Sequence, residues 1–225
     1  NLELIRRVPL FSTLTPAQAE SVSMAVTKQR FKRGEAIVTQ GQQSNCLSIL
    51  LTGRARVMTT DERGREVILA TLGPGDYTGE MSLIDNQPHS ASVRADLQTD
   101  VLLLGRTEFA RCLGENSAMA YAVMKGLVQR LRQADRNIES LALMDVYGRV
   151  ARVLIESATD DSPGRKVING KLSRQDVAKM IGASREMVSR VIKDLEEQGF
   201  IEVRADGVTF INDRRNPGRA LTRPV

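Results

Sequence analysis

Cysteine and histidine are scarce in this sequence. The two cysteines, Cys46 and Cys112, are far apart, and neither belongs to a CxxC motif. Because structural zinc sites and iron–sulfur clusters usually take four ligands, two cysteines are too few for either. The single histidine, His89, gives little support for a histidine-rich metal site or a haem pocket. We expect no metal and no prosthetic group, and we expect two buried reduced thiols, with a disulfide as the alternative.

The sequence also lacks the marks of a membrane protein, a secreted protein or an enzyme. No apolar run approaches the roughly 20 residues that cross a bilayer. Residues Asn1–Arg7 lack the basic-then-apolar order of a secretory signal. No Ser/His/Asp set, paired-carboxylate motif, P-loop or metal-ligand cluster is recognisable. We therefore expect a cytoplasmic protein that has no membrane partner and is not an enzyme.

Composition and charge favour a globular protein with a polyanionic partner. The 225 residues suffice for one large or two small domains. The formal net charge is +5, and basic residues outnumber acidic ones across residues 174–193. Residues 214–225 hold four arginines and no acid. Such a stretch is more typical of a solvated chain end than of a binding arm.

Residues 1–116 predict a sensing domain built mainly of short strands, within an α+β fold. Residues 1–30 read as short helices, with Thr15 as an N-cap and Pro16 in the first helical position. From about Phe31, apolar segments alternate with glycines at roughly ten-residue spacing, which favours a β-sandwich or double-sheet roll over βαβ units. Thr107 is a candidate cap for a short helix after these strands. The candidate strands are Ala36–Val38, Leu47–Leu51, Ala55–Met58, Val67–Ala70 and Val101–Leu104.

Residues 117–144 predict a dimerisation helix. From about Ser117 to Ala142 there is no proline, and apolar residues recur at alternating spacings of four and three. This heptad register is the seam of a two-stranded coiled coil. The alternative is an amphipathic helix that packs on its own domain. Length and register together favour a homodimer. The seam consists of Ala120, Met124, Leu127, Leu131, Ala134, Ile138 and Leu141.

Residues 145–225 predict a DNA-binding domain that contains a helix-turn-helix. A helix at Val146–Ser157 is expected to end before a break at Asp160–Gly164. Two further helices follow, the first capped by Ser173 and the second by Ser184, with Gly182 in the tight turn between them. Asp176 at the third position of the first helix comes close to a capping box. The expected core positions are Val177, Ala178, Ile181, Met187, Val188, Val191, Ile192 and Leu195.

The second of these helices has the side chains of a DNA-recognition helix. Arginine can donate two hydrogen bonds to guanine, and glutamate can accept one from cytosine, in the major groove. Gly199–Val203 and Val208–Ile211, joined by a turn at Ala205–Gly207, predict a hairpin wing. A surface helical hairpin with solvated charges is the alternative. The exposed face carries Arg185, Glu186, Ser189, Arg190 and Lys193.

Nearly the whole chain resembles the cyclic-AMP receptor protein and fumarate–nitrate regulator family of bacterial transcription factors. The matching motifs are GPGD at Gly73–Asp76, GEMSL at Gly79–Leu83, ASVRA at Ala91–Ala95, LMDVYGRV at Leu143–Val150 and SREMVSR at Ser184–Arg190. The resemblance implies an N-terminal double-stranded β-helix (jelly roll), a long dimerisation helix and a C-terminal winged helix-turn-helix. It also implies base contacts for Arg185, Glu186 and Arg190, and a phosphate contact for Arg174.

The resemblance further implies an effector site that begins at the Gly79–Glu80 turn. There a carboxylate such as Glu80 accepts from a ribose hydroxyl, while backbone amides, an arginine and a serine hold the cyclic phosphate. Ser90 is present, but His89 stands at the arginine position and is mostly neutral at pH 7. On the long helix, Ala134 and Asp135 stand where the cyclic-AMP regulator places Thr-Ser. Losing a buried charged contact costs about 2–3 kcal/mol, which disfavours cyclic AMP.

Cyclic di-GMP is the first alternative effector, because some relatives with altered cassettes respond to it. Several arginines could meet its phosphates or guanines, or could equally be solvated flanks of a coiled coil. Cyclic AMP and an effector-independent regulator with a relic pocket stay open, while iron–sulfur sensing is disfavoured by the cysteine count. The candidate effector residues are Gly79, Glu80, Met81, Ser82, His89, Ser90, Arg94, Arg130, Arg132 and Arg136.

The predicted function is that of a dimeric, sequence-specific DNA-binding transcription regulator. Its expected partners are a double-stranded DNA operator, a second copy of the chain, a nucleotide effector and RNA polymerase. A nucleotide-binding module that controls a protein partner is the alternative from another class. The helix-turn-helix argues against that alternative, since such modules end without one.

Overall fold

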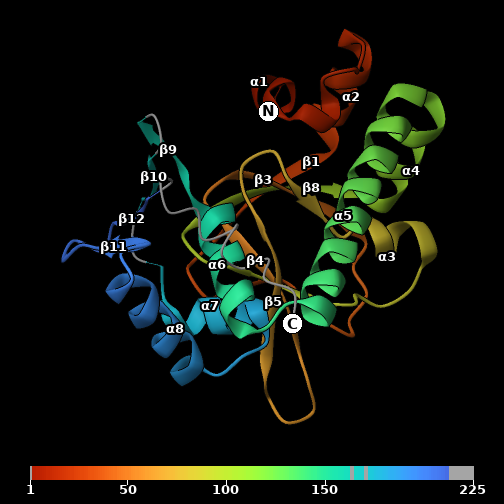
Figure 1. The fold of residues 1–225 in the computed structure, drawn as a ribbon. Helices are drawn as coiled ribbons and strands as arrows, with labels where there is room; N and C mark the ends of the chain where they lie inside the picture. The colour runs from red at the N-terminus through yellow and green to blue at the C-terminus, as the bar shows by residue number, and fades with distance from the viewer. Residues whose placement is uncertain (1, 163–164, 170–171, 213–225) are drawn as a thin grey trace. The chain divides into compact units, whose positions relative to one another are not determined.

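The computed structural model describes residues 2–162, 165–169 and 172–212 (Figure 1). The chain folds into two compact units, Asn1–Leu131 and Arg132–Val225, and the division lies inside one long helix. The predicted sensing, dimerisation and DNA-binding segments, with borders after residues 116 and 144, divide the chain by expected role and stay a prediction.

Short helices open the first unit. They are α1 (Leu2–Arg7), the 3-10 helix η1 (Pro9–Phe11) and α2 (Pro16–Ala25). Gln18 N donates to Thr15 Oγ1 over 3.3 Å, and Thr15 N donates back to Gln18 Oε1 over 3.0 Å. With Pro16 in the first helical position, this capping box confirms the predicted start of α2.

The strands of the first unit form a jelly roll. They are β1 (Val26–Phe31), β2 (Ala36–Val38), β3 (Cys46–Thr52), β4 (Ala55–Thr60), β5 (Glu66–Leu72), β6 (Tyr77–Thr78), β7 (Ser92–Ala95) and β8 (Thr99–Gly105). One antiparallel sheet has the order β1-β8-β3-β6 and the other the order β2-β7-β4-β5. This arrangement is the expected double-stranded β-helix. Leu47, Ile49 and Leu102 are fully buried in its core.

The strand prediction was wrong at three places. Strand β1 begins at Val26 rather than near Phe31, and neither β6 nor β7 was predicted. Between the buried ends of β1, residues 27–30 are all exposed, so the strand has no alternating pattern. It is held instead by its antiparallel pairing with β8. Strand β6 has only two residues, too few for any pattern to show.

Three helices pack around the roll: α3 (Glu80–Asp85), α4 (Arg106–Glu115) and α5 (Ser117–Leu143). Thr107 does not cap α4. The N-cap residue is Gly105, without a side-chain cap bond, and the Arg106 amide already bonds to Asn45 O over 2.7 Å. The helix therefore starts one residue before Thr107.

Helix α5 confirms the predicted long helix and carries two sets of apolar side chains. Met119 and Val123 are buried in the core of the first unit, and Leu127 packs partly against it. Leu127 thus serves its own domain as well as the predicted seam. Six exposed apolar side chains elsewhere on the helix form the set here called the α5 stripe. It consists of Tyr121, Met124, Val128, Leu131, Ile138 and Leu141.

The second unit is a winged helix. After the predicted helix α6 (Val146–Ser157) come β9 (Thr159–Ser162), β10 (Arg165–Ile168), α7 (Arg174–Ile181), α8 (Arg185–Glu197), β11 (Ile201–Val203) and β12 (Thr209–Asn212). The antiparallel sheet has the order β11-β12-β10-β9. Ile168, Ile201 and Ile211 from this sheet share a core with Val150 of α6 and Ile192 of α8. The predicted helix-turn-helix and hairpin wing are confirmed.

Three details of the second unit differ from expectation. The predicted break at Asp160–Gly164 contains most of β9, a fully exposed polar strand that pairs with β10. Ser173 is the N-cap residue of α7, but its hydroxyl makes no cap bond. Met187 is exposed rather than in the core. The arginine-rich residues 214–225 lie outside the described residues. Over the described part of the chain, no helix combines the length and apolarity needed to cross a membrane.

Candidate DNA-recognition surface and effector cassette

The turn between α7 and α8 fixes the start of the recognition helix. Gly182 ends α7 in the left-handed conformation, with φ +63°. Ser184 then caps α8, since Met187 N donates to Ser184 Oγ over 3.2 Å. Both features were predicted from the sequence. They leave the first turn of α8 ordered and its leading side chains, beginning with Arg185, at the helix end that would enter a groove.

The exposed face of α8 carries the predicted base-reading side chains. Val188, Ile192 and Leu195 are buried on the opposite face. Ser189 is only half-buried, between the two faces. The exposed members are Arg185, Glu186, Arg190 and Lys193.

Three arginines of this surface form no ion pair within the described part of the chain. Arg174, Arg185 and Arg190 make no ion pair and no side-chain hydrogen bond with any residue that the structure describes, whereas Lys193 pairs with Glu197 over 3.5 Å. Hydrogen bonds from its own backbone amide and from Ser184, together with the charge of Arg185, lower the pKa of Glu186. Glu186 is therefore ionised at neutral pH and can only accept. Guanidinium groups can donate to phosphates and guanine edges, and a carboxylate can accept from cytosine.

The sheet of the second unit adds two arginines that the sequence did not single out, one in β10 and one directly after β11. The guanidinium carbons of Arg165 and Arg204 lie 3.8 and 4.3 Å from the centre of the Phe210 ring. Glu202 accepts from both, over 3.3 Å from Arg165 and 3.1 Å from Arg204. Phe210 pairs across the sheet with Val167 and Glu202. Each arginine lies two positions from one of these two residues in the sequence.

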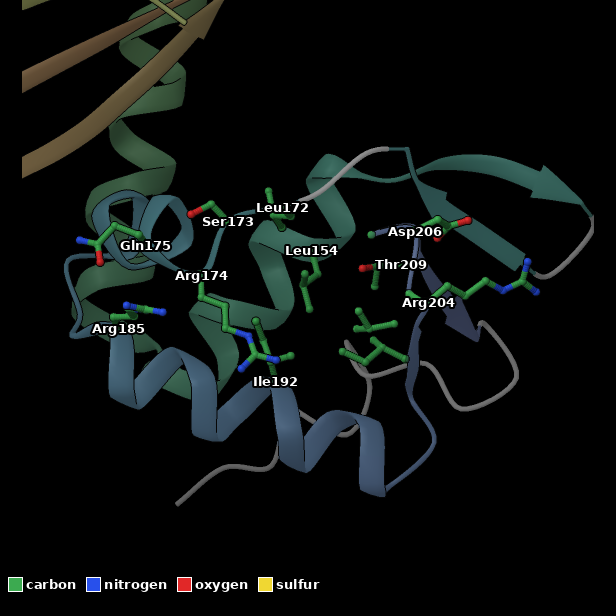
Figure 2. A pocket seen from close by; sticks show the side chains of 14 residues that line it. Leu154, Leu172, Ser173, Arg174, Gln175, Arg185, Ile192, Arg204, Asp206 and Thr209 are labelled. Atoms are coloured by element: carbon green, nitrogen blue, oxygen red, sulfur yellow. The ribbon is translucent and has the colours of Figure 1, made fainter. Parts of the chain in front are cut away.

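A hollow of about 580 Å³, here called the wing pocket, lies among α6, the start of α7, α8 and the wing. Figure 2 shows Arg174 and Arg185 on its α7–α8 side, with Arg204 and Asp206 on the wing side. Sequence reasoning did not predict it, because its walls come from segments up to about fifty residues apart. The lining includes Leu154, Leu172, Ser173, Arg174, Gln175, Arg185, Ile192, Ile201, Val203 and Thr209.

In the first unit, residues 79–90 form the segment here called the effector cassette. Gly79 has φ +93°, and a Cβ there would lie 2.9 Å from Cys46 O, so only glycine fits. The next residue, Glu80, is 1% exposed, and its Oε1 accepts from Arg130 Nη1 on α5. Arg130 Nη2 donates to Tyr77 O, and its guanidinium lies 5.0 Å from the centre of the Tyr77 ring. Two residues of the predicted effector set, Glu80 and Arg130, are thus brought together.

Three buried polar atoms of the cassette have no hydrogen-bond partner among the described residues. They are Glu80 Oε2, Ser82 Oγ and His89 Nε2. Burial raises the pKa of Glu80, and Arg130 opposes that rise. Burial lowers the pKa of His89, so its imidazole is neutral at pH 7. Because a buried polar atom without a partner is costly, these atoms mark a place where a polar ligand could bind.

Arg106 is a supporting residue that the sequence did not reveal. Its guanidinium donates to Leu83 O over 3.0 Å and to Ser82 O over 3.2 Å, at the end of α3. It also donates to Asn45 Oδ1 over 3.3 Å. Arg106 therefore holds the cassette helix against the loop before β3.

The remaining candidate effector residues are exposed or make other contacts. Met81 and Ser90 are exposed. Arg94 on β7 pairs with Glu66 over 3.5 Å. Arg132 and Arg136 are exposed on the part of α5 that belongs to the second unit, where Arg136 donates to Gln133.

The cysteines are unpaired, with Cys112 buried and Cys46 half-buried. Burial raises the pKa of Cys112 to about 11. Across the described residues, no group of three His, Cys, Asp or Glu side chains is placed to hold a metal ion. Burial raises the pKa of the Cys46 thiol as well, so both thiols are protonated at neutral pH.

Two parts of the chain match known protein domains. Residues 28–116 match the cyclic nucleotide-binding domain, and residues 148–216 match the Crp-like helix-turn-helix domain. The cAMP-activated global transcriptional regulator Vfr of Pseudomonas aeruginosa is 31% identical over 196 residues, which cover 83% of this chain and 90% of Vfr. The cAMP-activated global transcriptional regulator CRP of Salmonella typhimurium is 30% identical over 185 residues, which cover 81% of this chain and 87% of CRP.

Solved structures share the fold. The c-di-GMP responsive global regulator CLP of Xanthomonas campestris superposes with a TM-score of 0.75 at 22% identity, covering 88% of this chain and 99% of CLP. FixK2 from Bradyrhizobium japonicum gives a TM-score of 0.73 at 23% identity, covering 89% of this chain and 98% of FixK2. With both family domains matched and the Vfr and CRP sequences aligned over most of its length, this chain belongs to the CRP/FNR family of DNA-binding transcription regulators.

Proposed function

We propose that the chain acts as a homodimer that reads an inverted-repeat operator through α8. The observation that carries the proposal is the set of unpaired guanidinium groups of Arg174, Arg185 and Arg190 around a capped recognition helix. Arg185, Glu186 and Arg190 contact base edges, and Arg174 contacts a phosphate. Ser184, Ser189 and Lys193 complete the contact surface.

The α5 stripe supports the dimer. A helix of 27 residues that leaves the six large apolar side chains of the stripe exposed can bury part of that surface by pairing with a second copy. A two-fold dimer presents two copies of α8, so the operator half-sites are centred about one helical turn apart. RNA polymerase is the further partner that we propose for such a regulator.

Binding-site selection from random DNA, followed by fluorescence anisotropy on the selected operator, tests this proposal. Arg185→Gln should weaken the operator complex and relax the preference at one guanine of each half-site. Arg33→Gln, an exposed arginine of the first unit, is the matched control and should bind as the unchanged protein does. If selection yields no sequence, or if Arg185→Gln weakens all sequences equally, the assignment of α8 as base reader is wrong.

The effector is a nucleotide bound at the cassette, with cyclic di-GMP as the leading candidate. The free, buried Oε2 of Glu80 supports a ribose hydroxyl as its donor. The neutral imidazole of His89 gives no guanidinium clamp for a single cyclic phosphate. That CLP, a protein of the same fold, is c-di-GMP responsive gives the candidate a precedent.

Cyclic AMP is the second candidate. The observation in its favour is that Vfr and CRP, the relatives at 30–31% identity, are both cAMP-activated. The ion pair between Glu80 and Arg130 is compatible with either nucleotide, because it leaves one carboxylate oxygen free.

Calorimetric titration with cyclic AMP, cyclic GMP and cyclic di-GMP separates the candidates. Glu80→Gln should weaken the binding of whichever nucleotide the protein recognises. Glu62→Gln, which changes an exposed carboxylate, is the control. Micromolar cyclic AMP binding that His89→Ala abolishes would overturn the preference for cyclic di-GMP. If no nucleotide binds, the cassette is a relic and the regulator is independent of an effector.

A further inference from the structure

The wing pocket has a size and a lining that suit a small molecule. Its volume of about 580 Å³ lies within the range of roughly 300–1,000 Å³ that ligand sites occupy. It is built wholly from the second unit, by α6, the start of α7, α8 and the wing strands β11 and β12. It is therefore separate from the effector cassette of the first unit.

One end of the pocket is cationic. Arg174, at the start of α7, and Arg185, at the start of α8, both line it (Figure 2). Neither makes an ion pair with a described residue. The wing end differs, because Arg204 is already bound to Glu202 and Asp206 brings a carboxylate. An anion would therefore bind at the α7–α8 end.

The wall between the two ends is apolar. Leu154, Ile192 and Ile201 line it, and their side chains are otherwise buried, at 3%, 6% and 4% exposure. Val203 extends this wall on the wing, where it is 40% exposed. Because the first three side chains are nearly covered by their own domain, Val203 supplies most of the apolar surface that a ligand body could contact, with the edges of Ile192 and Ile201 beside it.

We propose that the wing pocket binds a small amphipathic anion, with its charged group between Arg174 and Arg185 and its apolar body on the wall that includes Val203. The charged group is a carboxylate, phosphate or sulfonate. Because both arginines belong to the proposed DNA-recognition surface, the ligand competes with operator DNA. That consequence rests on the proposed function, whereas the binding site itself does not.

The test uses anilinonaphthalene sulfonate, an amphipathic anion whose fluorescence rises in apolar surroundings, titrated into the full-length protein. Arg174→Gln and Arg185→Gln remove one charge each, and each should weaken probe binding about tenfold. Arg33→Gln removes an exposed arginine of the first unit that does not line the pocket, so it is the control and should leave probe binding unchanged. Val203→Thr keeps the shape but adds a hydroxyl to the wall, and should also weaken the probe. The neutral analogue phenylnaphthylamine should bind less tightly, and its affinity should not change when Arg174 or Arg185 is replaced.

Circular dichroism establishes that each variant is folded. The inference is overturned if Arg174→Gln and Arg185→Gln bind the probe like the unchanged protein, or if the neutral analogue binds equally well. Operator DNA should displace the probe from the unchanged protein. A chain that binds no DNA would refute the proposed function, while the probe titrations would still decide whether the wing pocket is a ligand site.

Discussion

Gly126 lies where α5 packs closely on Tyr77 of the jelly roll, and replacing it tests how tightly the two are packed. A Cβ at this position would lie 2.2 Å from Tyr77 Oη and 3.2 Å from Tyr77 Cζ. Real Cβ atoms do not approach an oxygen so closely, so Gly126→Ala forces Tyr77 or the helix to move. The same tyrosine donates to Val123 O over 3.4 Å and lies under the Arg130 guanidinium.

Two opposed effects set the change in the free energy of unfolding that Gly126→Ala causes. Alanine inside a helix is favoured over glycine by about 1 kcal/mol, whereas overpacking costs about 1–3 kcal/mol. The Gly126→Ala variant should therefore be less stable by up to about 2 kcal/mol. Tyr77→Phe alone loses only a long hydrogen bond, worth about 0.5–1 kcal/mol. In the double variant the nearest remaining ring atom is 3.2 Å away, so small shifts relieve the clash.

The expected result is a coupling free energy of about 1–3 kcal/mol between the two substitutions, with Tyr77→Phe rescuing Gly126→Ala. Urea unfolding followed by circular dichroism measures it, at one protein concentration because dimerisation would shift the midpoint. Free energies of unfolding that add to within about 0.5 kcal/mol would refute the close packing of Gly126 on Tyr77.

Three further predictions concern the dimer, the operator and pH. Leu131→Glu and Ile138→Glu should each give monomers that lose operator affinity, and an unchanged dimer in analytical ultracentrifugation would contradict the role of the α5 stripe. Arg185→Ala should cost about 1–3 kcal/mol of operator affinity, measured by anisotropy, and the loss should vanish when the contacted guanine is replaced. Hydrogen bonds from Arg30 and Lys28 hold the pKa of Asp100 well below its usual range, so its ionised form stabilises the fold above the unfolded pKa and loses that effect as the pH falls. The stability difference between the unchanged protein and Asp100→Asn should therefore shrink between pH 7 and pH 3 in thermal unfolding.

The sequence predicted best where the determinants are local. The αL glycine Gly182 and the cap Ser184 lie within a few residues of the turn that they define, and both were predicted from spacing. Strands β1 and β9 were missed for the opposite reason. Most or all of their residues are exposed, and pairing with β8 and β10 makes them strands. Pairing between distant segments leaves no period in the chain itself.

The same limit applies to the sites. Glu80 and Arg130 were both candidate effector residues, but the ion pair between them spans 50 positions and required the fold. The wing pocket is likewise lined by residues from α6 and from the wing, and no sequence motif predicts it. Met187 was assigned to the core because it fits the apolar period of α8, yet it lies at the edge of the buried face, where periodicity alone cannot distinguish core from surface.

Helix α5 connects the cassette with the predicted dimer seam through adjacent residues. Arg130 binds the carboxylate of Glu80, and the next residue, Leu131, belongs to the exposed α5 stripe. Under the proposed function, a ligand that donates to the free Glu80 oxygen acts on the carboxylate that Arg130 binds, next to the α5 stripe. The effect on DNA affinity can be no larger than the difference in ligand affinity between two arrangements of the protein. A hundredfold preference therefore gives at most about 2.7 kcal/mol per site. Because the coupling is reciprocal, operator DNA must raise the affinity for an activating nucleotide by the same factor, and must lower the affinity for any anion held in the wing pocket.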